Sequence, residues 1–314
     1  LNTIAGKHAT NGGAVAGKTT GVVTPGSDVL KVSGSEDALL TAFESNTPTV
    51  QDPVSNTAAA RISGMETRGI VVGSYDTGTA LTLAEATKFS NYTSGVVEAT
   101  IAAGTLANFM NASTDVIAFE AGNKYSFTLT NDAFTPAQIV QINKLAATTT
   151  GTISLNPATG ALNSPAVEGT AAELAKYFSL TNLAPTTGTS LGTEAITITA
   201  TDTSITAADL KTIVTANGGV KAAKGVQASN VTDVTGSVTD LAAIYDGTIN
   251  ISTDANRVVS GLGNENLTIT DLVVDAAKLD DLTKAATTAD GSAAKSSGNI
   301  NVISSGISGS YADV

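Results

Sequence analysis

The chain has 314 residues, of which 42% are hydrophobic, 4% aromatic and 14% charged, and it contains neither Trp nor Cys. The net charge of −12, with only 16 Lys and Arg, disfavours a nucleic-acid partner, because phosphate neutralisation requires clustered basic side chains. The absence of Cys excludes disulfides, thiolate metal sites and Cys nucleophiles, and no apolar run approaches the ~20 residues that span a bilayer.

Near the N-terminus, Gly12–Thr19 matches the nucleotide-binding pattern G-x-x-x-x-G-K-T. A functional loop of this kind follows a buried strand and opens a helix, whose amides hold the phosphates. Between residues 2 and 11, however, Ile4 is the only large apolar residue, and Pro25 and Gly26 follow where a helix is required. We therefore interpret the match as a product of Gly- and Thr-rich composition.

Residues 1–78 are predicted to form an irregular, β-rich N-terminal region. Its clearest element is "SGSEDALLTAF", a helical turn from residue 33 to 43 with Ser35 as the N-cap. Between Asn46 and Gly78, prolines and glycines interrupt the pattern, which indicates loops or an insertion. We place a domain boundary near Gly78.

Residues 79–314 are predicted to be tandem strand–helix repeats. Two segments that begin on a threonine, "TLAEATKF" from Thr82 and "TLANFM" from Thr105, open this region. Three longer segments then share an alternating apolar/Thr strand, a cap residue and an amphipathic helical turn. They span residues 127–142, 196–213 and 267–282.

The helix starts give the repeat its period. The caps of the three long segments are Thr135, Thr206 and Asp275. A second series, in which a glycine precedes the cap, begins its helices at Thr170, Ser237 and Ser310. The two series alternate, so caps recur about every 35 residues, a period typical of solenoids and tandem arrays. This pattern predicts an α/β fold with a solenoid-like repeat architecture of short strands and short N-capped helices.

The sequence stops at Val314, at a position where earlier repeats begin the apolar face of a helix. Two expectations follow. The chain could belong to a longer tandem array, or the next subunit could complete the last repeat in a head-to-tail fibre.

Few residues of the chain could take part in catalysis or bind a metal ion. His8 is the single histidine, and without Cys it supports neither a His-based triad nor a transition-metal cluster. No EF-hand loop occurs, but four aspartates in predicted turns could contribute to weak Ca²⁺ sites. They are Asp202, Asp233, Asp254 and Asp290. The sequence predicts no catalytic residue and no other cofactor.

Three stretches resemble a known family: "VTDVTGSVTDLAAIYDG", "VVSGLGNENLTITD" and "VDAAKLDDLTKAATTADGS". They are similar to the Thr/Ala/Gly-rich tandem repeats of giant cell-surface proteins of marine cyanobacteria, of the type linked to swimming without flagella. The resemblance covers roughly residues 79–314. It implies secretion, an extended repetitive architecture and a structural role, and it carries over no catalytic residues.

We therefore expect a structural extracellular or cell-surface protein, a subunit or segment of a filament, surface layer or stalk whose main partner is itself. The alternative is an adhesin or phage-fibre module that recognises glycans or a cell surface. A third hypothesis is an enzyme, either a nucleotide hydrolase through Gly12–Thr19 or a glycan-cleaving solenoid with a carboxylate cluster.

Overall fold

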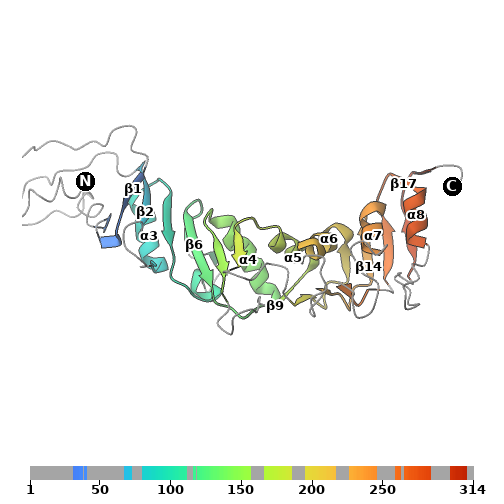
Figure 1. Ribbon diagram of the computed structural model, residues 1–314, viewed down its shortest axis with the longest axis horizontal. Helices are drawn as coiled ribbons and strands as arrows, with labels where there is room; N and C mark the ends of the chain where they lie inside the picture. Colours follow the sequence, from blue (N-terminus) through green and yellow to red (C-terminus); the bar gives the residue numbers. More distant parts are fainter. Residues whose placement is uncertain are drawn as a thin grey trace, which may run out of the picture. The chain divides into compact units, whose positions relative to one another are not determined.

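The computed structural model describes residues 31–37, 39–40, 67–72, 80–111, 116–117, 119–156, 166–185, 195–216, 226–245, 259–262, 265–283 and 298–309. It is an α/β structure with mostly parallel sheets (Figure 1). The chain divides into two compact units, Leu1–Thr128 with Ala147–Ile153 and Leu129–Ala146 with Ser154–Val314. The predicted boundary near Gly78 falls outside the described residues and stays a prediction.

Unit 1 is built on a parallel ladder in which the strands follow chain order, β1-β2-β3-β6. Its elements are β1 (Lys31–Gly34), β2 (Gly69–Val72), α3 (Leu83–Tyr92), β3 (Val97–Thr100), the 3₁₀ turn η2 (Leu106–Phe109), the antiparallel pair β4 (Met110–Asn111) and β5 (Val116–Ile117), and β6 (Lys124–Leu129). One acidic side chain of this ladder pairs with two basic side chains. Glu98 accepts hydrogen bonds from Lys31 at 3.0 Å and from Lys124 at 2.6 Å.

Helix α3 of unit 1 begins as the sequence predicts. Thr82 caps α3 by accepting the backbone N–H of Glu85, and the Glu85 carboxylate accepts the backbone N–H of Thr82 at 2.6 Å. This reciprocal pair is a capping box. The helix then packs Phe89 into the core, and the Tyr125 hydroxyl donates to the Ala86 carbonyl at 3.0 Å.

Unit 2 contains most of the predicted repeats. Its strands are β7 (Ala133–Phe134), β8 (Ile153–Leu155), β9 (Ala166–Gly169), β10 (Leu183–Pro185), β11 (Ile196–Ile198), β12 (Ser204–Thr206), β13 (Val226–Gln227), β14 (Asp233–Gly236), β15 (Val259–Ser260), β16 (Asn266–Ile269), β17 (Val273–Asp275), β18 (Ile300–Val302) and β19 (Gly306–Ser308). Its helices are α4 (Pro136–Thr148), α5 (Ala171–Phe178), α6 (Ala207–Ala216), α7 (Val238–Tyr245) and α8 (Ala276–Thr283). The division between the units falls within β6, α4 and β8.

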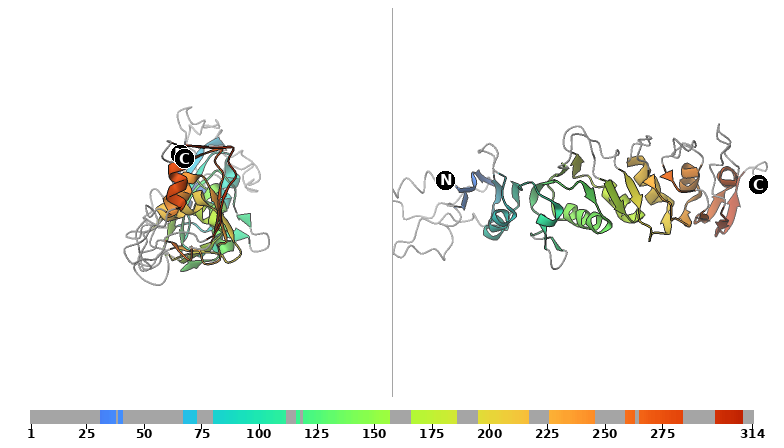
Figure 2. Two further views of the ribbon diagram at one scale, coloured as in Figure 1. Left: turned by 90° about the vertical axis from the view of Figure 1, so that its right-hand side faces the viewer. Right: turned by 90° about the horizontal axis from the view of Figure 1, so that it is seen from below.

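Three parallel ladders run through unit 2, again in chain order. They are β7-β9-β11-β13-β15, β12-β14-β16-β18 and β17-β19. In Figure 1, α5, α6, α7 and α8 also follow one another in chain order, and seen along the ladders they lie on one side of the strands (Figure 2, left).

The alternation of apolar residues and threonine creates the core. Because successive side chains of a strand point to opposite faces, every second residue of each strand faces inward. One inward row consists of register partners that are all buried, namely Val167, Ile196, Val226 and Val259. Each such side chain contributes about 1.5–3 kcal/mol on burial. The alternating pattern that the sequence predicts from Ile196 onward is confirmed for β11, where Ile196 and Ile198 are buried and Thr197 between them is not.

The predicted helix caps are confirmed in unit 2 wherever the structure describes them. Thr135, Thr170, Thr206, Ser237 and Asp275 each accept a backbone N–H from the first turn of α4, α5, α6, α7 and α8, respectively. Ser310 lies outside the described residues. Among the described helices, none combines the length and apolar character that crossing a membrane requires.

Candidate functional site

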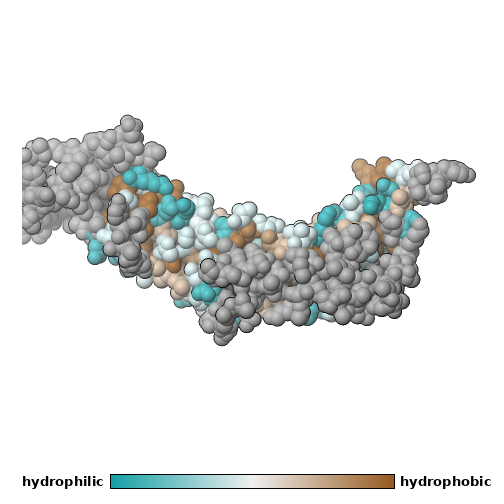
Figure 3. All heavy atoms as spheres, viewed as in Figure 1, coloured by the Kyte–Doolittle hydropathy of each residue, from teal (hydrophilic) through white to brown (hydrophobic). Residues whose placement is uncertain are grey.

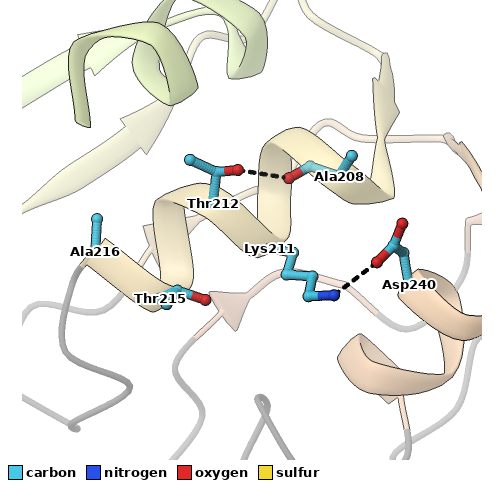
Figure 4. A pocket seen from close by; sticks show the side chains of 6 residues that line it. All are labelled: Ala208, Lys211, Thr212, Thr215, Ala216 and Asp240. Carbon is cyan, nitrogen blue, oxygen red and sulfur yellow. Dashed lines mark hydrogen bonds and ion pairs between the residues drawn. The ribbon is translucent and has the colours of Figure 1, made fainter. Parts of the chain in front are cut away.

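A shallow depression beside α6 and α7 is the first candidate for a functional site (Figure 4). Small side chains line it, together with Lys211 from α6 and Asp240 from α7. The Lys211 ammonium donates to the Asp240 carboxylate at 2.7 Å. That hydrogen bond is the main reason that the pKa of Asp240 lies below its ordinary value, with a smaller contribution from Ser237.

Three polar side chains of this depression, Lys211, Thr212 and Asp240, already have structural partners. The second carboxylate oxygen of Asp240 accepts the Ser237 hydroxyl at 3.0 Å, and the Asp240 backbone N–H donates to Ser237 at 3.1 Å. The Thr212 hydroxyl donates back to the Ala208 carbonyl at 2.9 Å. The Ser237 hydroxyl and the Asp240 carboxylate are within hydrogen-bond distance, but together they form the N-terminal cap of α7. The ion pair instead links α6 to α7, and pairs this exposed stabilise by about 0–1 kcal/mol.

A second arrangement connects residues 31 and 33 positions apart in the sequence. The first backbone N–H of α5, from Ala171, donates to the carboxylate of Asp202 at 2.7 Å, across 31 residues. In the same way, the first backbone N–H of α7, from Val238, donates to Asp271 at 2.5 Å, across 33 residues. Each helix start is therefore held both by its own cap and by an aspartate from the strand segment that follows. A carboxylate at this position also complements the positive end of the helix dipole.

Of the four predicted Ca²⁺ candidates, the structure describes two. Asp202 is the capping residue described above. Asp233 lies in β14, where its carboxylate accepts the Thr232 hydroxyl at 2.7 Å and the Asn266 amide at 3.2 Å. Those two hydrogen bonds, Thr232 first, lower the pKa of Asp233. Asp254 and Asp290 lie outside the described residues.

The structure brings together no metal cluster in the part of the chain that it describes, where no three His, Cys, Asp or Glu residues are grouped as ligands. The nucleotide-type segment Gly12–Thr19 and His8 lie outside that part. The interpretation of Gly12–Thr19 therefore stays a prediction.

One buried ionisable pair was not predicted. Glu265, which is 1% exposed, accepts a hydrogen bond from the Tyr245 hydroxyl in the interior of unit 2. Burial, followed by the neighbouring charge of Glu265, raises the pKa of Tyr245. The acid lies one position before β16, so the pattern of the strand gives no sign that its side chain is buried.

Asp271 was also missed, although the sequence contained a signal for it. When the two long segments are aligned on their caps, Thr206 and Asp275, Asp271 falls at the same place as Asp202. An acid four residues before the cap in both repeats indicates a shared structural role rather than an isolated turn residue.

Comparison of the chain with protein-family models, with characterised proteins and with solved structures gives no match. The function is therefore argued from the geometry of this chain.

Proposed function

We propose that this chain is a structural segment, a β-solenoid that serves as an elongated scaffold. In this proposal each stretch between register partners forms one coil, and coils stack in the order of the sequence. The observation that carries it is the spacing of neighbouring strands. The Asn266 amide donates to Asp233, and the backbone N–H of Asn299, the residue before β18, donates to Asn266; both contacts join residues 33 positions apart along parallel strands.

The use of the polar side chains supports the same conclusion. The cap residues hold helix starts, Asp202 and Asp271 tie one coil to the next, and Asp233 and Asn266 join strands laterally. Polar side chains that could contact a substrate in an enzyme here form hydrogen bonds with the backbone and with neighbouring coils. This arrangement favours a stacked scaffold over a catalytic site.

We further propose that the scaffold belongs to an extracellular filament, surface layer or stalk, with other copies of the chain as the main partner. The low content of charged residues and the resemblance of the repeats to cell-surface proteins support this assignment. The large aromatic rings of Phe89, Tyr125 and Tyr177 are fully buried, and we therefore place the alternative of a glycan-binding adhesin second.

A tandem duplication of residues 206–274 tests the solenoid directly. The duplication joins Val274 to a second Thr206 and so adds a whole strand–helix period in phase with the caps. Neighbouring strands lie about 4.8 Å apart, so two added coils should lengthen the particle by about 10 Å at constant cross-section. Small-angle scattering measures both quantities, and circular dichroism measures the secondary structure per residue.

The matched control is a duplication of residues 206–258, which ends between ladder strands and places the next strand out of phase. We expect this variant to lose cooperative unfolding. Equal behaviour of both variants, or an in-phase variant that grows in all directions, would contradict the solenoid.

A further inference from the structure

Two core positions of the helices in unit 2 differ in how strictly the repeats keep them. Both are counted from the cap residue, and they lie one turn apart on the same face of a helix. In α4–α7 the residue four positions after the cap is Ile or Leu and is 0% exposed: Ile139, Leu174, Leu210 and Leu241. The residue eight positions after the cap is also buried, but it is different in each helix: Asn143, Phe178, Val214 and Tyr245. We call this second place the variable core position.

Two residues at the variable core position carry polar groups that contact the following coil. The side-chain amide of Asn143, on α4, donates to the Glu173 carbonyl at 3.0 Å and to the Glu173 carboxylate at 2.6 Å, in the first turn of α5. The hydroxyl of Tyr245, at the end of α7, donates to the carboxylate of Glu265, which directly precedes β16. The side chain of Phe178, which takes the place of Tyr245 in α5, has no group that could make such a contact.

Stability alone does not account for these buried polar groups. Asn143 and Glu265 are each 1% exposed, and moving an amide or a carboxylate out of water is costly unless all of its hydrogen bonds are replaced. The side-chain oxygen of Asn143 has no hydrogen-bond partner among the described residues. Val214 fills the same place in α6 without this cost and is 0% exposed. An apolar residue would therefore stabilise the variable core position at least as well.

Coils of similar sequence need a feature that distinguishes the right neighbour from a wrong one. The inward register partners Val234, Leu267 and Ile300 are all aliphatic, so pairing of β14 with β18 instead of β16 would preserve this row. Polar residues at the surface do not discriminate, because they are hydrated whichever coil lies beside them; Figure 3 shows hydrophilic residues at the surface of both units. In the wrong stack, however, Glu265 would no longer lie beside Tyr245.

We propose that the variable core position specifies which coil stacks on which, through the contacts of Asn143 with Glu173 and of Tyr245 with Glu265. This inference rests on the proposed solenoid, because coils that could exchange neighbours occur only in a repeat structure. The physical reason is an asymmetry of buried hydrogen bonds. A bond that is formed adds little stability, whereas a broken one leaves a polar group without water and without a partner. A buried polar residue fixes the register of coiled coils in the same way.

The test uses cysteine pairs in the 314-residue chain, which has no Cys of its own. Thr235 and Thr268 are register partners on β14 and β16, and Asn301 on β18 follows Thr268 in register. The pair Thr235→Cys/Thr268→Cys is therefore about 4.8 Å apart in the native stack and should form a disulfide. The pair Thr235→Cys/Asn301→Cys is about 9.6 Å apart there, too far for a disulfide, and joins only when β16 is skipped.

The contact variant is Tyr245→Phe/Glu265→Leu, which makes the variable core position of α7 like that of α5. After unfolding and oxidative refolding at low protein concentration, mass spectrometry measures the intramolecular disulfide. We expect the fraction with the Thr235→Cys/Asn301→Cys disulfide to rise about tenfold or more over the same pair without the contact variant. This ratio corresponds to one buried polar group left unpaired in the wrong stack. Urea titration should show unchanged or greater stability.

The matched control is Lys211→Ala/Asp240→Ala, which removes a partly exposed polar contact between α6 and α7 and should leave the disulfide fraction unchanged. Asn143→Val, which copies Val214, tests the other contact independently. Hydrogen exchange of peptides that cover α4 and α5 should give two isotope envelopes in this variant, from two coexisting stacks, and one envelope in the wild type.

Three results would overturn the proposal. They are a disulfide fraction that stays at the wild-type level or rises equally in the control, a single isotope envelope in Asn143→Val, and a large loss of stability in the contact variants, which would show that the contacts hold the fold and not its register. The duplication experiment measures the length of the particle and not the order of its coils. Failure of the solenoid and failure of this inference are therefore distinguishable.

Discussion

Gly151 lies at a corner of unit 1 where two stretches of backbone approach too closely for any side chain. A Cβ atom on Gly151 would lie 2.2 Å from the carbonyl oxygen of Tyr125, whereas real Cβ contacts essentially never fall below 3.0 Å. The same corner is held by Thr149, whose hydroxyl oxygen accepts the backbone N–H groups of Tyr125 at 2.9 Å and of Gly151 at 3.0 Å. A clash at Gly151 therefore acts on the hydrogen bonds of β6.

The size of the effect can be estimated for Gly151→Ala. The clash forces the two backbone stretches apart by several tenths of an ångström, and overpacking of this kind costs about 1–3 kcal/mol. A Gly→Ala change without strain stabilises by about 0.4–1 kcal/mol through the unfolded state. The net expectation is a loss of about 1–2 kcal/mol in the local opening free energy of β6.

Hydrogen exchange on peptides that cover β6 measures this loss, which corresponds to exchange about five- to thirtyfold faster. Gly306→Ala is the matched control, because a Cβ there meets nothing within 4 Å, and exchange in β19 should be unchanged or slower. If β6 kept its protection in Gly151→Ala, or if β19 lost as much in Gly306→Ala, the close-approach argument would be wrong.

Three further predictions concern unit 2. Asp271→Ala removes the carboxylate that holds the start of α7 and should lower the free energy of unfolding by about 1 kcal/mol, whereas Asp271→Asn, which keeps an acceptor, should lose less in urea titrations. Tyr245→Phe leaves the buried carboxylate of Glu265 without the phenol and should cost about 1–3 kcal/mol; in a double-mutant cycle Glu265→Gln should recover part of that loss. The depressed pKa of Asp240 stabilises the fold above the ordinary aspartate pKa, and this contribution is lost as the pH falls through the depressed value. Lys211→Met should therefore flatten the stability profile below about pH 4, by less than 1 kcal/mol because the pair is partly exposed. An unchanged acid limb would refute this assignment.

The features that could be predicted from the sequence are those that depend on a few adjacent residues. A cap such as Thr206 and the acid of Asp209 lie three residues apart, so their hydrogen bonds form within one helical turn whatever surrounds them. The alternation of apolar residues and threonine likewise fixes which face of each strand is buried. The exposure of Leu272 and Val273 required the structure, because a strand pattern reads them as ordinary apolar positions.

The features that could not be predicted depend on register. Asp271 meets the amide of Val238, and Glu265 meets Tyr245, only because one strand segment is placed beside another. A shift of one residue in the pairing would turn the side chains to opposite faces and remove both contacts. The close approach at Gly151 has the same origin. The sequence around a glycine in a polar turn does not show whether the glycine is needed for lack of space or for its backbone conformation.

Register also explains the unusual composition of the chain. Parallel stacking places equivalent side chains of successive strands about 4.8 Å apart. A charged residue repeated at an outward position would therefore lie beside a like charge in every neighbouring strand and be repelled by it. The outward rows of one ladder are Ser204, Asp233 and Asn266, and Thr206, Thr235, Thr268 and Asn301. Hydroxyl and amide groups can donate to and accept from their neighbours along such a row, as Asn266 and Asp233 do. Where two charged residues are register partners, at Glu98 and Lys124, they are opposite in sign. A low content of charged residues, with Thr and Asn in their place, is thus what repeated parallel stacking selects at the surface.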